Sequence, residues 1–355
     1  MAEHSTKSAA IRTYGRRVAA ALALTVVAVA VGAQAPQRAA AVVPADCQSD
    51  PSAAIAALAP GDTFYGSGCY LVPNGITLTQ PVTLVGGTYV DPSTTKSPSG
   101  RVQPVILVSH TTDVTLQGLA IIGANPSGAF VKKLVGQAGI ELMDTDRVTI
   151  EDVSVSGTYG DGLELWANAP NQLTPNTDVT VDGLAITEAG RNGISLSDVY
   201  GATFTNVSID SWGLTSVDFE SDIAGIGAGN VTFTDSTWGG TIFTEAVTGP
   251  LSFERCTNRN TIRLTARAAT TFPITFSDGS LAIGSKATNI GVYAHGPTDV
   301  TFNNETFTRL PRPNGKPQKT PMWNASAGAK LTFNSSTLSI PLGINDATSV
   351  VTINP

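Results

Sequence analysis

The chain has 355 residues, of which 35 are glycine and 21 are proline, and only 14% are charged. A coiled coil or a long helical bundle needs many more Lys, Glu, Arg and Leu residues, so the composition excludes both classes. The formal net charge is −7, and an acidic protein is a poor partner for nucleic acid or for an anionic membrane surface.

Residues 1–35 have the features of a signal peptide. An apolar run of 16 residues extends from Val18 to Ala33, and Ala33-Gln34-Ala35 fits a small-x-small cleavage pattern, with cleavage after Ala41 equally compatible. The run is short for a membrane span, although an uncleaved anchor is the alternative. We therefore predict a secreted, extracellular protein without stable membrane insertion after signal removal. Four basic residues precede the run: Lys7, Arg12, Arg16 and Arg17.

The two cysteines near the mature amino end are predicted to form a disulfide. Cys47 and Cys69 lie 22 residues apart, and exported chains fold under oxidising conditions. Cys256 has no obvious partner and lies in a strand-like stretch, where a buried free thiol behaves as a small hydrophobe.

A short helix is expected within this amino-terminal segment. Asp50 suits the N-cap, Pro51 the first helical position, and Ala53 to Ala59 the helix itself. An open solenoid exposes its core and its strand edges. We therefore predict a disulfide-tied cap over residues 36–75.

From residue 82 onward, a triplet recurs in which Thr or Ser lies between two apolar residues. Eleven copies span 269 residues, a mean period near 27. Such a period, with strand alternation inside each unit, indicates a solenoid. Each unit can hold three short strands and three turns, which is one rung of a right-handed parallel β-helix. The copies begin at Val82, Val114, Val148, Val179, Ala202, Val231, Leu251, Ile274, Val300, Leu331 and Val351.

Small residues that tolerate a left-handed backbone follow many of these triplets, two places after the last apolar residue. We expect a tight corner at each of them. They are Gly118, Asp152, Gly183, Asn206, Asp235, Asp278 and Asn304.

A second strand aligns from rung to rung, beginning with residues 140–143 and 163–166. Its first and third residues are mostly apolar and should point inward, so its second and fourth should face solvent. The second column reads Glu141, Glu164, Ser195, Asp218, Phe243, Arg263 and Tyr293. The fourth reads Met143, Trp166, Ser197, Glu220, Glu245, Thr265 and His295. We thus predict an all-β parallel β-helix of about eleven rungs over residues 76–355.

Together these features resemble the pectin-lyase-like superfamily of secreted right-handed parallel β-helices, over residues 76–355. Its members include polysaccharide lyases, polygalacturonase-type hydrolases, epimerases and surface proteins without catalysis. The resemblance therefore implies the fold and a carbohydrate-related role, but it does not select one activity.

Polygalacturonases provide the nearest local match, because their catalytic face carries Asp-Asp, Gly-His-Gly and Arg-Ile-Lys motifs. Asp161 matches the second Asp, and Arg263 is a loose match to the Arg, although its segment lies too many rungs away. Gly160 and Asn192 stand where the family has the first Asp and the His. The standard hydrolase motifs are therefore incomplete.

The densest polar group on the predicted face supplies the candidate site residues. The catalytic candidates are Asp161, Arg191, Asp218 and Glu220. The candidates for substrate binding are Glu164, Trp166, Asn192, Asp222, Glu245 and Arg263, with Trp166 expected to stack on a sugar ring. A solvated sheet face of ordinary polar residues is the competing interpretation.

Two mechanisms fit this group. In a hydrolase, Asp218 or Glu220 acts as the acid and Asp161 as the base. In a lyase, a calcium ion held by Asp161, Asp218 and Glu220 neutralises a substrate carboxylate, and Arg191 or Arg263 accepts the neighbouring proton.

The predicted function is that of a polysaccharide lyase or a glycoside hydrolase acting on an extracellular polysaccharide that contains uronate. The alternative is a non-catalytic β-helix that binds glycans or builds a surface. Polysaccharide is the expected partner and calcium the one candidate cofactor, whereas the oligomeric state is left open.

Overall fold

The computed structural model describes residues 47–94, 102–167, 175–210, 213–220, 227–245, 247–259, 262–265, 272–283, 292–309, 323–338, 343–344 and 349–354. The predicted signal peptide, residues 36–46 of the predicted cap and Asp222 lie outside these residues. Of the helices found in these ranges, none has the length and apolar character that a membrane crossing requires.

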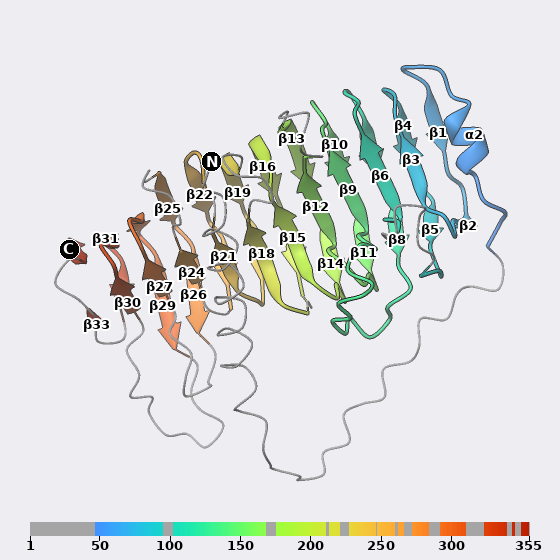
Figure 1. The fold of residues 1–355 in the computed structure, drawn as a ribbon. Coiled ribbons are helices and arrows are strands. Elements are labelled where there is room, and N and C mark those ends of the chain that lie inside the picture. Colours follow the sequence, from blue (N-terminus) through green and yellow to red (C-terminus); the bar gives the residue numbers. More distant parts are fainter. Residues whose placement is uncertain are drawn as a thin grey trace, which may run out of the picture. The chain divides into compact units, whose positions relative to one another are not determined.

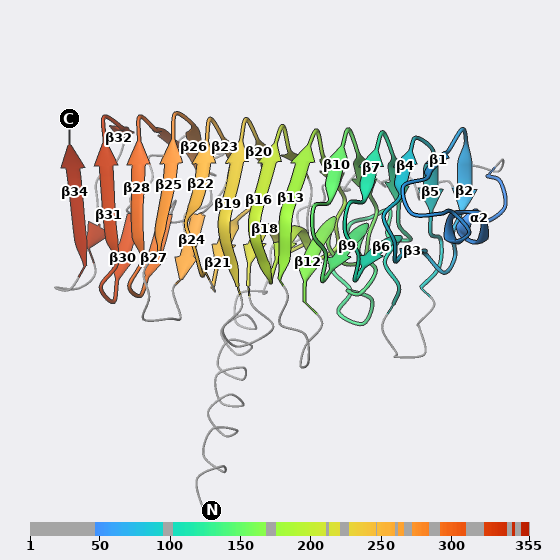
Figure 2. The ribbon, with the colours of Figure 1, turned by 90° about the horizontal axis from the view of Figure 1, so that it is seen from above.

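The described residues form three parallel sheets that enclose one apolar core (Figures 1 and 2). Neighbouring strands in every sheet are three apart in chain order, so each rung contributes one strand to each sheet. The predicted parallel β-helix is therefore present. The first sheet, here called the triplet sheet, has 12 strands in the described ranges: β1 (Thr63–Tyr65), β4 (Thr83–Val85), β7 (Thr115–Gln117), β10 (Thr149–Glu151), β13 (Asn176–Asp182), β16 (Val199–Thr205), β19 (Ala228–Thr234), β22 (Leu251–Glu254), β25 (Pro273–Ser277), β28 (Asp299–Asn303), β31 (Lys330–Asn334) and β34 (Val350–Asn354).

The other two sheets each have 11 strands in the part of the chain that is described. The middle sheet consists of β2 (Cys69–Leu71), β5 (Thr88–Val90), β8 (Ala120–Ile122), β11 (Ser154–Ser156), β14 (Ala185–Thr187), β17 (Ser208–Ile209), β20 (Thr237–Trp238), β23 (Thr257–Asn258), β26 (Ser280–Ile283), β29 (Thr306–Arg309) and β32 (Thr337–Leu338). The site sheet consists of β3 (Ile76–Leu78), β6 (Ile106–Ser109), β9 (Ile140–Met143), β12 (Leu163–Trp166), β15 (Asn192–Leu196), β18 (Thr215–Phe219), β21 (Ile242–Thr244), β24 (Ile262–Thr265), β27 (Val292–His295), β30 (Trp323–Ser326) and β33 (Gly343–Ile344).

The repeated triplet sets the register of the triplet sheet. The middle Thr or Ser of each copy pairs with its counterpart on the next strand, from Thr83 to Thr352. The flanking residues point the opposite way, because side chains alternate along a strand, and nearly all of them are buried. All seven residues predicted at corners have a positive φ, between 50° and 73°. The sequence repeat and the structural rung therefore coincide.

The first rung begins earlier than the repeat suggested. Strands β1 and β2 lie inside the segment predicted as a cap, and they pair in parallel with β4 and β5. Residues 63–71 thus already belong to the coil, because Thr63 pairs with Thr83 as later triplets pair with one another.

Helix α2 (Ser52–Ala56) is shorter than the predicted helix over Ala53 to Ala59. The backbone N–H of Ser52 donates to Asp50 Oδ1 at 2.8 Å, so the carboxylate serves the start of the helix. Pro60 limits the other end of the helix, because the residue that precedes a proline rarely adopts the helical conformation. The helix lies at the amino-terminal end of the coil (Figure 1) and contacts β3. Its Ile55 is buried in the core.

The cysteines behave as expected from the sequence. Cys47 and Cys69 form a disulfide. Cys256 is a buried free thiol, and burial raises its pKa to about 12. The thiol is therefore protonated at neutral pH and packs as an apolar side chain.

A row of stacked phenylalanine rings fills the core behind the triplet sheet. Phe253 lies between Phe233 and Phe276, with ring centroids 5.4 and 4.5 Å apart and nearly parallel planes. Trp238 meets the row edge-on, 6.0 Å from Phe253. In-register pairing places the same triplet position of successive rungs side by side. Phenylalanine at that position in several rungs therefore produces a stack of rings.

We expect Phe253→Ala to lower the free energy of unfolding by about 3–5 kcal/mol, because it removes a buried ring that is stacked on both sides. Urea unfolding followed by circular dichroism measures the loss. Tyr65→Ala is the control, since that ring is 74% exposed and its loss should change stability by less than about 0.5 kcal/mol. Equal losses for the two variants would contradict the assignment of the core.

Candidate functional site

The outward second column of the site sheet brings four polar residues into one row. Glu141, Glu164, Ser195 and Asp218 pair in register across β9, β12, β15 and β18. Neighbouring members are one strand spacing apart, about 4.8 Å. The expected alignment of this column is therefore present.

The expectation that this column faces solvent is wrong for these four residues. Glu141 is 3%, Glu164 5%, Ser195 0% and Asp218 7% exposed. They point away from the apolar core, yet other polar side chains cover them. The indole of Trp166, for example, donates to Glu141 Oε1 at 2.7 Å. A plain solvated sheet face does not describe this part of the molecule.

Glycines allow the rungs to approach closely where the site strands begin. A Cβ on Gly162 would lie 2.5 Å from Ile186 Cγ2 and 2.7 Å from the carbonyl oxygen of Gly193. Only glycine fits there without a shift of the backbone. The residues just before these glycines, Asp161 and Asn192, are thereby held one above the other, and the backbone N–H of Asn192 donates to Asp161 Oδ1 at 2.8 Å.

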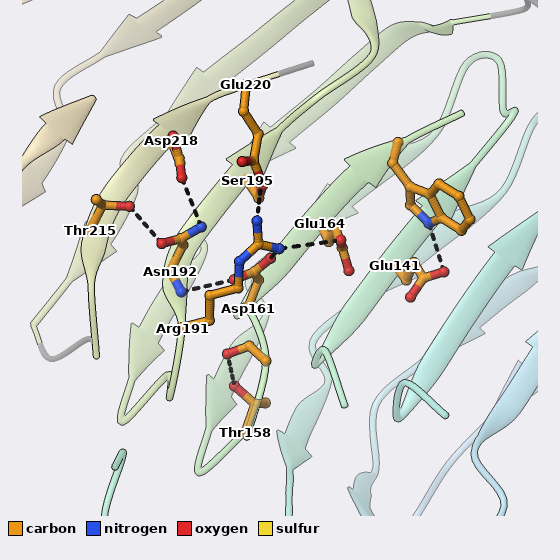
Figure 3. A network of polar contacts seen from close by, with 12 residues as sticks. Glu141, Thr158, Asp161, Glu164, Arg191, Asn192, Ser195, Thr215, Asp218 and Glu220 are labelled. Atoms are coloured by element: carbon orange, nitrogen blue, oxygen red, sulfur yellow. Dashed lines mark hydrogen bonds and ion pairs between the residues drawn. The ribbon is translucent and has the colours of Figure 1, made fainter. Parts of the chain in front are cut away.

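Arg191 lies at the centre of the site and contacts three carboxylates (Figure 3). Its Nη1 is 3.0 Å from Asp161 Oδ2 and 3.6 Å from Glu164 Oε1, and its Nη2 donates to Glu220. One guanidinium thus offsets the mutual repulsion of three carboxylates from two rungs.

A second chain of hydrogen bonds runs beside this ion cluster. Thr215 Oγ1 donates to Asn192 Oδ1 at 2.7 Å, and Asn192 Nδ2 donates to Asp218 Oδ2 at 3.1 Å (Figure 3). Ser195 Oγ donates to Glu220 Oε1 at 3.2 Å. The other oxygen of Asp218 is buried and has no hydrogen-bond partner among the described residues. A bound molecule reaches it only when the side chains that cover it move.

Burial and charge shift the pKa values of this cluster. Burial, together with repulsion by Glu220, raises the pKa of Asp218 to about 7 against the attraction of Arg191. Burial also raises the pKa of Asp161, although Arg191 opposes the shift. Burial alone would lower the pKa of Arg191, but the three carboxylates around it raise the value above its ordinary range. Asp218 is thus poised to exchange a proton near neutral pH.

Not all predicted site residues belong to this cluster. Arg263 lies on β24, two strands beyond β18, and its guanidinium packs on Phe243 and Tyr293 instead. It therefore does not take the place of the polygalacturonase arginine. Glu245 lies beyond β18 and raises the pKa of Asp218 by repulsion, whereas Asp222 lies outside the described residues.

Two residues of the network were missed as candidates from the sequence. Thr215 is the first residue of β18, as Asn192 is of β15, and the two pair in register. Aligning the first residues of these strands would have found it. Ser195 stood in the predicted column, but nothing marked its hydroxyl as a donor to Glu220.

The proposed calcium ligands do not form a cation site. Within the described part of the chain, no group of three or more His, Cys, Asp or Glu residues is placed to hold a metal ion. Both oxygens of Asp161 already accept hydrogen bonds from Arg191 and Asn192. The guanidinium supplies the positive charge that calcium was expected to bring, so these residues do not fit the ion.

Comparisons with known proteins identify the fold alone. No protein-family model matches the chain, and a search of curated protein sequences finds no match. The surface adhesin PfbA of Streptococcus pneumoniae is similar in structure, with a TM-score of 0.51 at 8% identity over 82% of this chain and 75% of that one.

Two further structures are similar to the chain at lower scores. An exopolygalacturonase from Thermotoga maritima has a TM-score of 0.48 at 11% identity, covering 85% of this chain and 86% of its own. A tailspike protein of Acinetobacter baumannii bacteriophage Fri1, a capsular polysaccharide depolymerase, also scores 0.48, at 13% identity over 84% of this chain and 61% of its own. The similarity to PfbA identifies the fold alone, a right-handed parallel β-helix of the kind found in pectin-lyase-like proteins.

Arg191→Gln should destabilise the protein by about 3–5 kcal/mol at pH 8, because it leaves several carboxylates buried without their counter-charge. The loss should shrink at pH 5, where those carboxyls can take up protons. Arg255→Gln is the matched control, since that side chain is 46% exposed beside Asp235 and Glu254 and its exposed ion pairs contribute little to stability. Urea unfolding at both pH values gives the comparison, and a loss independent of pH would contradict the arrangement.

Asp218 should make stability depend on pH. Its pKa is raised from 3.8 to about 7 in the folded protein, so the folded state holds this proton more tightly than the unfolded state does. The free energy of unfolding should therefore fall as pH rises from about 4 to about 7, by up to about 4 kcal/mol at 1.36 kcal/mol per pKa unit. Asp218→Asn should lack this part of the slope, and parallel curves for the two proteins would rule it out.

Proposed function

We propose that this protein is exported and hydrolyses an extracellular polysaccharide, with Asp218 and Glu220 as the reacting carboxyl groups. The observation that carries the proposal is the contrast between these two groups. Asp218 is buried with one oxygen unpartnered, whereas the side chain of Glu220 is 24% exposed and is held by Arg191 and Ser195. Glycoside hydrolysis requires such a pair, one carboxyl that gives a proton and one that acts on water or on the sugar.

Asp218 serves as the general acid in this mechanism. Its pKa of about 7 keeps it largely protonated in mildly acidic solution, and its free oxygen can direct the proton at a leaving-group oxygen. Asn192 donates to the other oxygen and so fixes the orientation of the carboxyl group.

Glu220 takes the role of the base, which the sequence had given to Asp161. Both oxygens of Asp161 accept hydrogen bonds inside the protein, so neither is left to accept a proton from an attacking water molecule. Glu220 lies two residues from Asp218, so the two side chains leave the segment on the same face, with Cα atoms about 6.6 Å apart.

The lyase mechanism fits these residues less well. Arg191 was a candidate to accept a proton, yet its ion pairs raise its pKa and keep it charged. A guanidinium that stays protonated cannot remove a proton from a sugar carbon. Arg191 instead positions Glu220 and balances the charge of Asp161 and Glu164.

Polysaccharide as substrate rests on two supports. The resemblance to the pectin-lyase-like superfamily implies carbohydrate as a partner, and paired carboxyl groups are the usual means of cleaving glycosidic bonds. The site also lies along a row of strands, so a linear polymer can follow several rungs at once.

A non-catalytic glycan-binding role is the second candidate. One observation favours it: Arg191 already pairs with Asp161, Glu164 and Glu220 inside the protein. A closed ion-pair network of this kind can also serve rigidity alone. The non-catalytic alternative does not explain why one buried oxygen of Asp218 has no hydrogen-bond partner among the described residues.

The test is a screen of the purified mature protein on neutral and uronate-containing polysaccharides, following new reducing ends and the ultraviolet absorbance of unsaturated products. We expect reducing ends without unsaturation, unaffected by chelator, with activity falling above about pH 7 as Asp218 loses its proton. Asp218→Asn and Glu220→Gln should each lower the rate at least 100-fold. Unsaturated products would identify a lyase, and inactivity on every polymer would favour the binding role.

A further inference from the structure

A second cluster lies on the site sheet beyond Asp218, and the proposed reaction does not use it. The second column continues from Asp218 to Phe243, Arg263 and Tyr293 on β21, β24 and β27, each paired in register with the next. These last three residues are called the arginine stack below. They lie on the same outward face as the acidic cluster, displaced along it by one to three rungs.

The geometry of the arginine stack holds a cation at the surface. Arg263 Cζ is 5.1 Å from the ring centroid of Phe243 and 5.8 Å from that of Tyr293, both within the range of cation–π attraction. Arg263 is exposed, and the two rings are half-buried. The rings restrain the guanidinium but accept none of its five N–H groups as a carboxylate would.

The two arginines of this face differ in their partners. Arg191 contacts three carboxylates, whereas Arg263 forms no ion pair with any residue in the described ranges. In a chain with a net charge of −7, an exposed guanidinium that lies between two rings, with no counter-ion among the described residues, is suited to an anion from outside.

We infer that the arginine stack binds a sugar unit that carries a negative charge, two strands away from the unit cleaved at Asp218. This inference rests on the proposed polysaccharide substrate and specifies its charge pattern. The guanidinium pairs with the anionic group, and the ring of Tyr293 packs on the face of the sugar.

The charges along the column determine where the charged sugar unit of the polymer binds. Asp218, Glu220 and Glu245 repel an anionic group, so the charged sugar unit avoids the acidic cluster and is placed at Arg263. Within the second column, two strand spacings, about 9.6 Å, separate Asp218 from Arg263. Arg263 is therefore a specificity-determining residue that selects polymers and positions them on the strand face.

The experiment is isothermal titration calorimetry of the full mature chain with three oligosaccharides of equal length: a uronate oligomer, a neutral oligomer and a sulfated neutral oligomer. We expect the uronate oligomer to bind more tightly than the neutral one. Arg263→Gln should weaken its binding at least tenfold and leave the neutral oligomer unchanged. Arg255→Gln, which removes the same charge on another sheet, should match the wild type.

The sulfated oligomer tells which anion is used. Binding of both acidic oligomers with the same dependence on Arg263 supports recognition of negative charge, and binding of the uronate oligomer alone supports recognition of a carboxylate. Equal wild-type affinity for acidic and neutral oligomers, no binding of any oligomer, or acidic binding unaffected by Arg263→Gln would each overturn the inference. The urea midpoint of each variant shows that the fold is retained.

These binding results are separate from the outcome of the cleavage screen. Asp218→Asn should abolish cleavage and keep the binding that depends on Arg263. If no polymer is cleaved while this binding persists, the hydrolase proposal fails and the arginine stack stands. If cleavage occurs equally on neutral and acidic polymers and Arg263→Gln changes neither, the inference about the stack fails alone.

Discussion

In-register stacking of parallel strands is the constraint on which this structure depends. Each rung places its residues directly above those of the rung before. Residues at the same position of successive rungs therefore form a column in which neighbours are about 4.8 Å apart. Thr83 therefore pairs with Thr115, and Phe233 stacks on Phe253. The same rule that orders the core also lines up carboxyl groups on the outer face, where like charges oppose one another.

The acidic cluster is possible only because Arg191 reaches across neighbouring rungs. Its guanidinium contacts Asp161 and Glu164 from the rung on one side and Glu220 from the rung on the other. Burying charges in this way adds little net stability compared with an apolar contact of the same size. A fold with a continuous apolar core does not need such a network for its stability. That contrast supports the proposed chemical role of the network.

The sequence predicts the coil well because its pattern is local and repeated. A triplet and a corner residue recur within each rung, and corners such as Asp152 and Asn206 take the left-handed backbone that their residue types favour. The candidate site follows only in part. Column membership is periodic, so Glu164 and Asp218 could be aligned, but burial of the outward face depends on how Trp166 and Arg191 fold over it. No pattern of apolar and polar residues encodes the direction of those side chains.

The modular rung has a consequence for how such a surface can change through evolution. Glu164 and Asp218 share one column with the arginine stack, and β18 and β21 are adjacent strands. Gain of one rung between β18 and β21 leaves every column in register and keeps the contacts of Arg191 and of Arg263. It shifts their separation by a fixed step of about 4.8 Å. The distance between two binding sites on the coil therefore changes in whole rungs. The spacing of the groups recognised on a polymer can change in this way while the reacting residues stay the same.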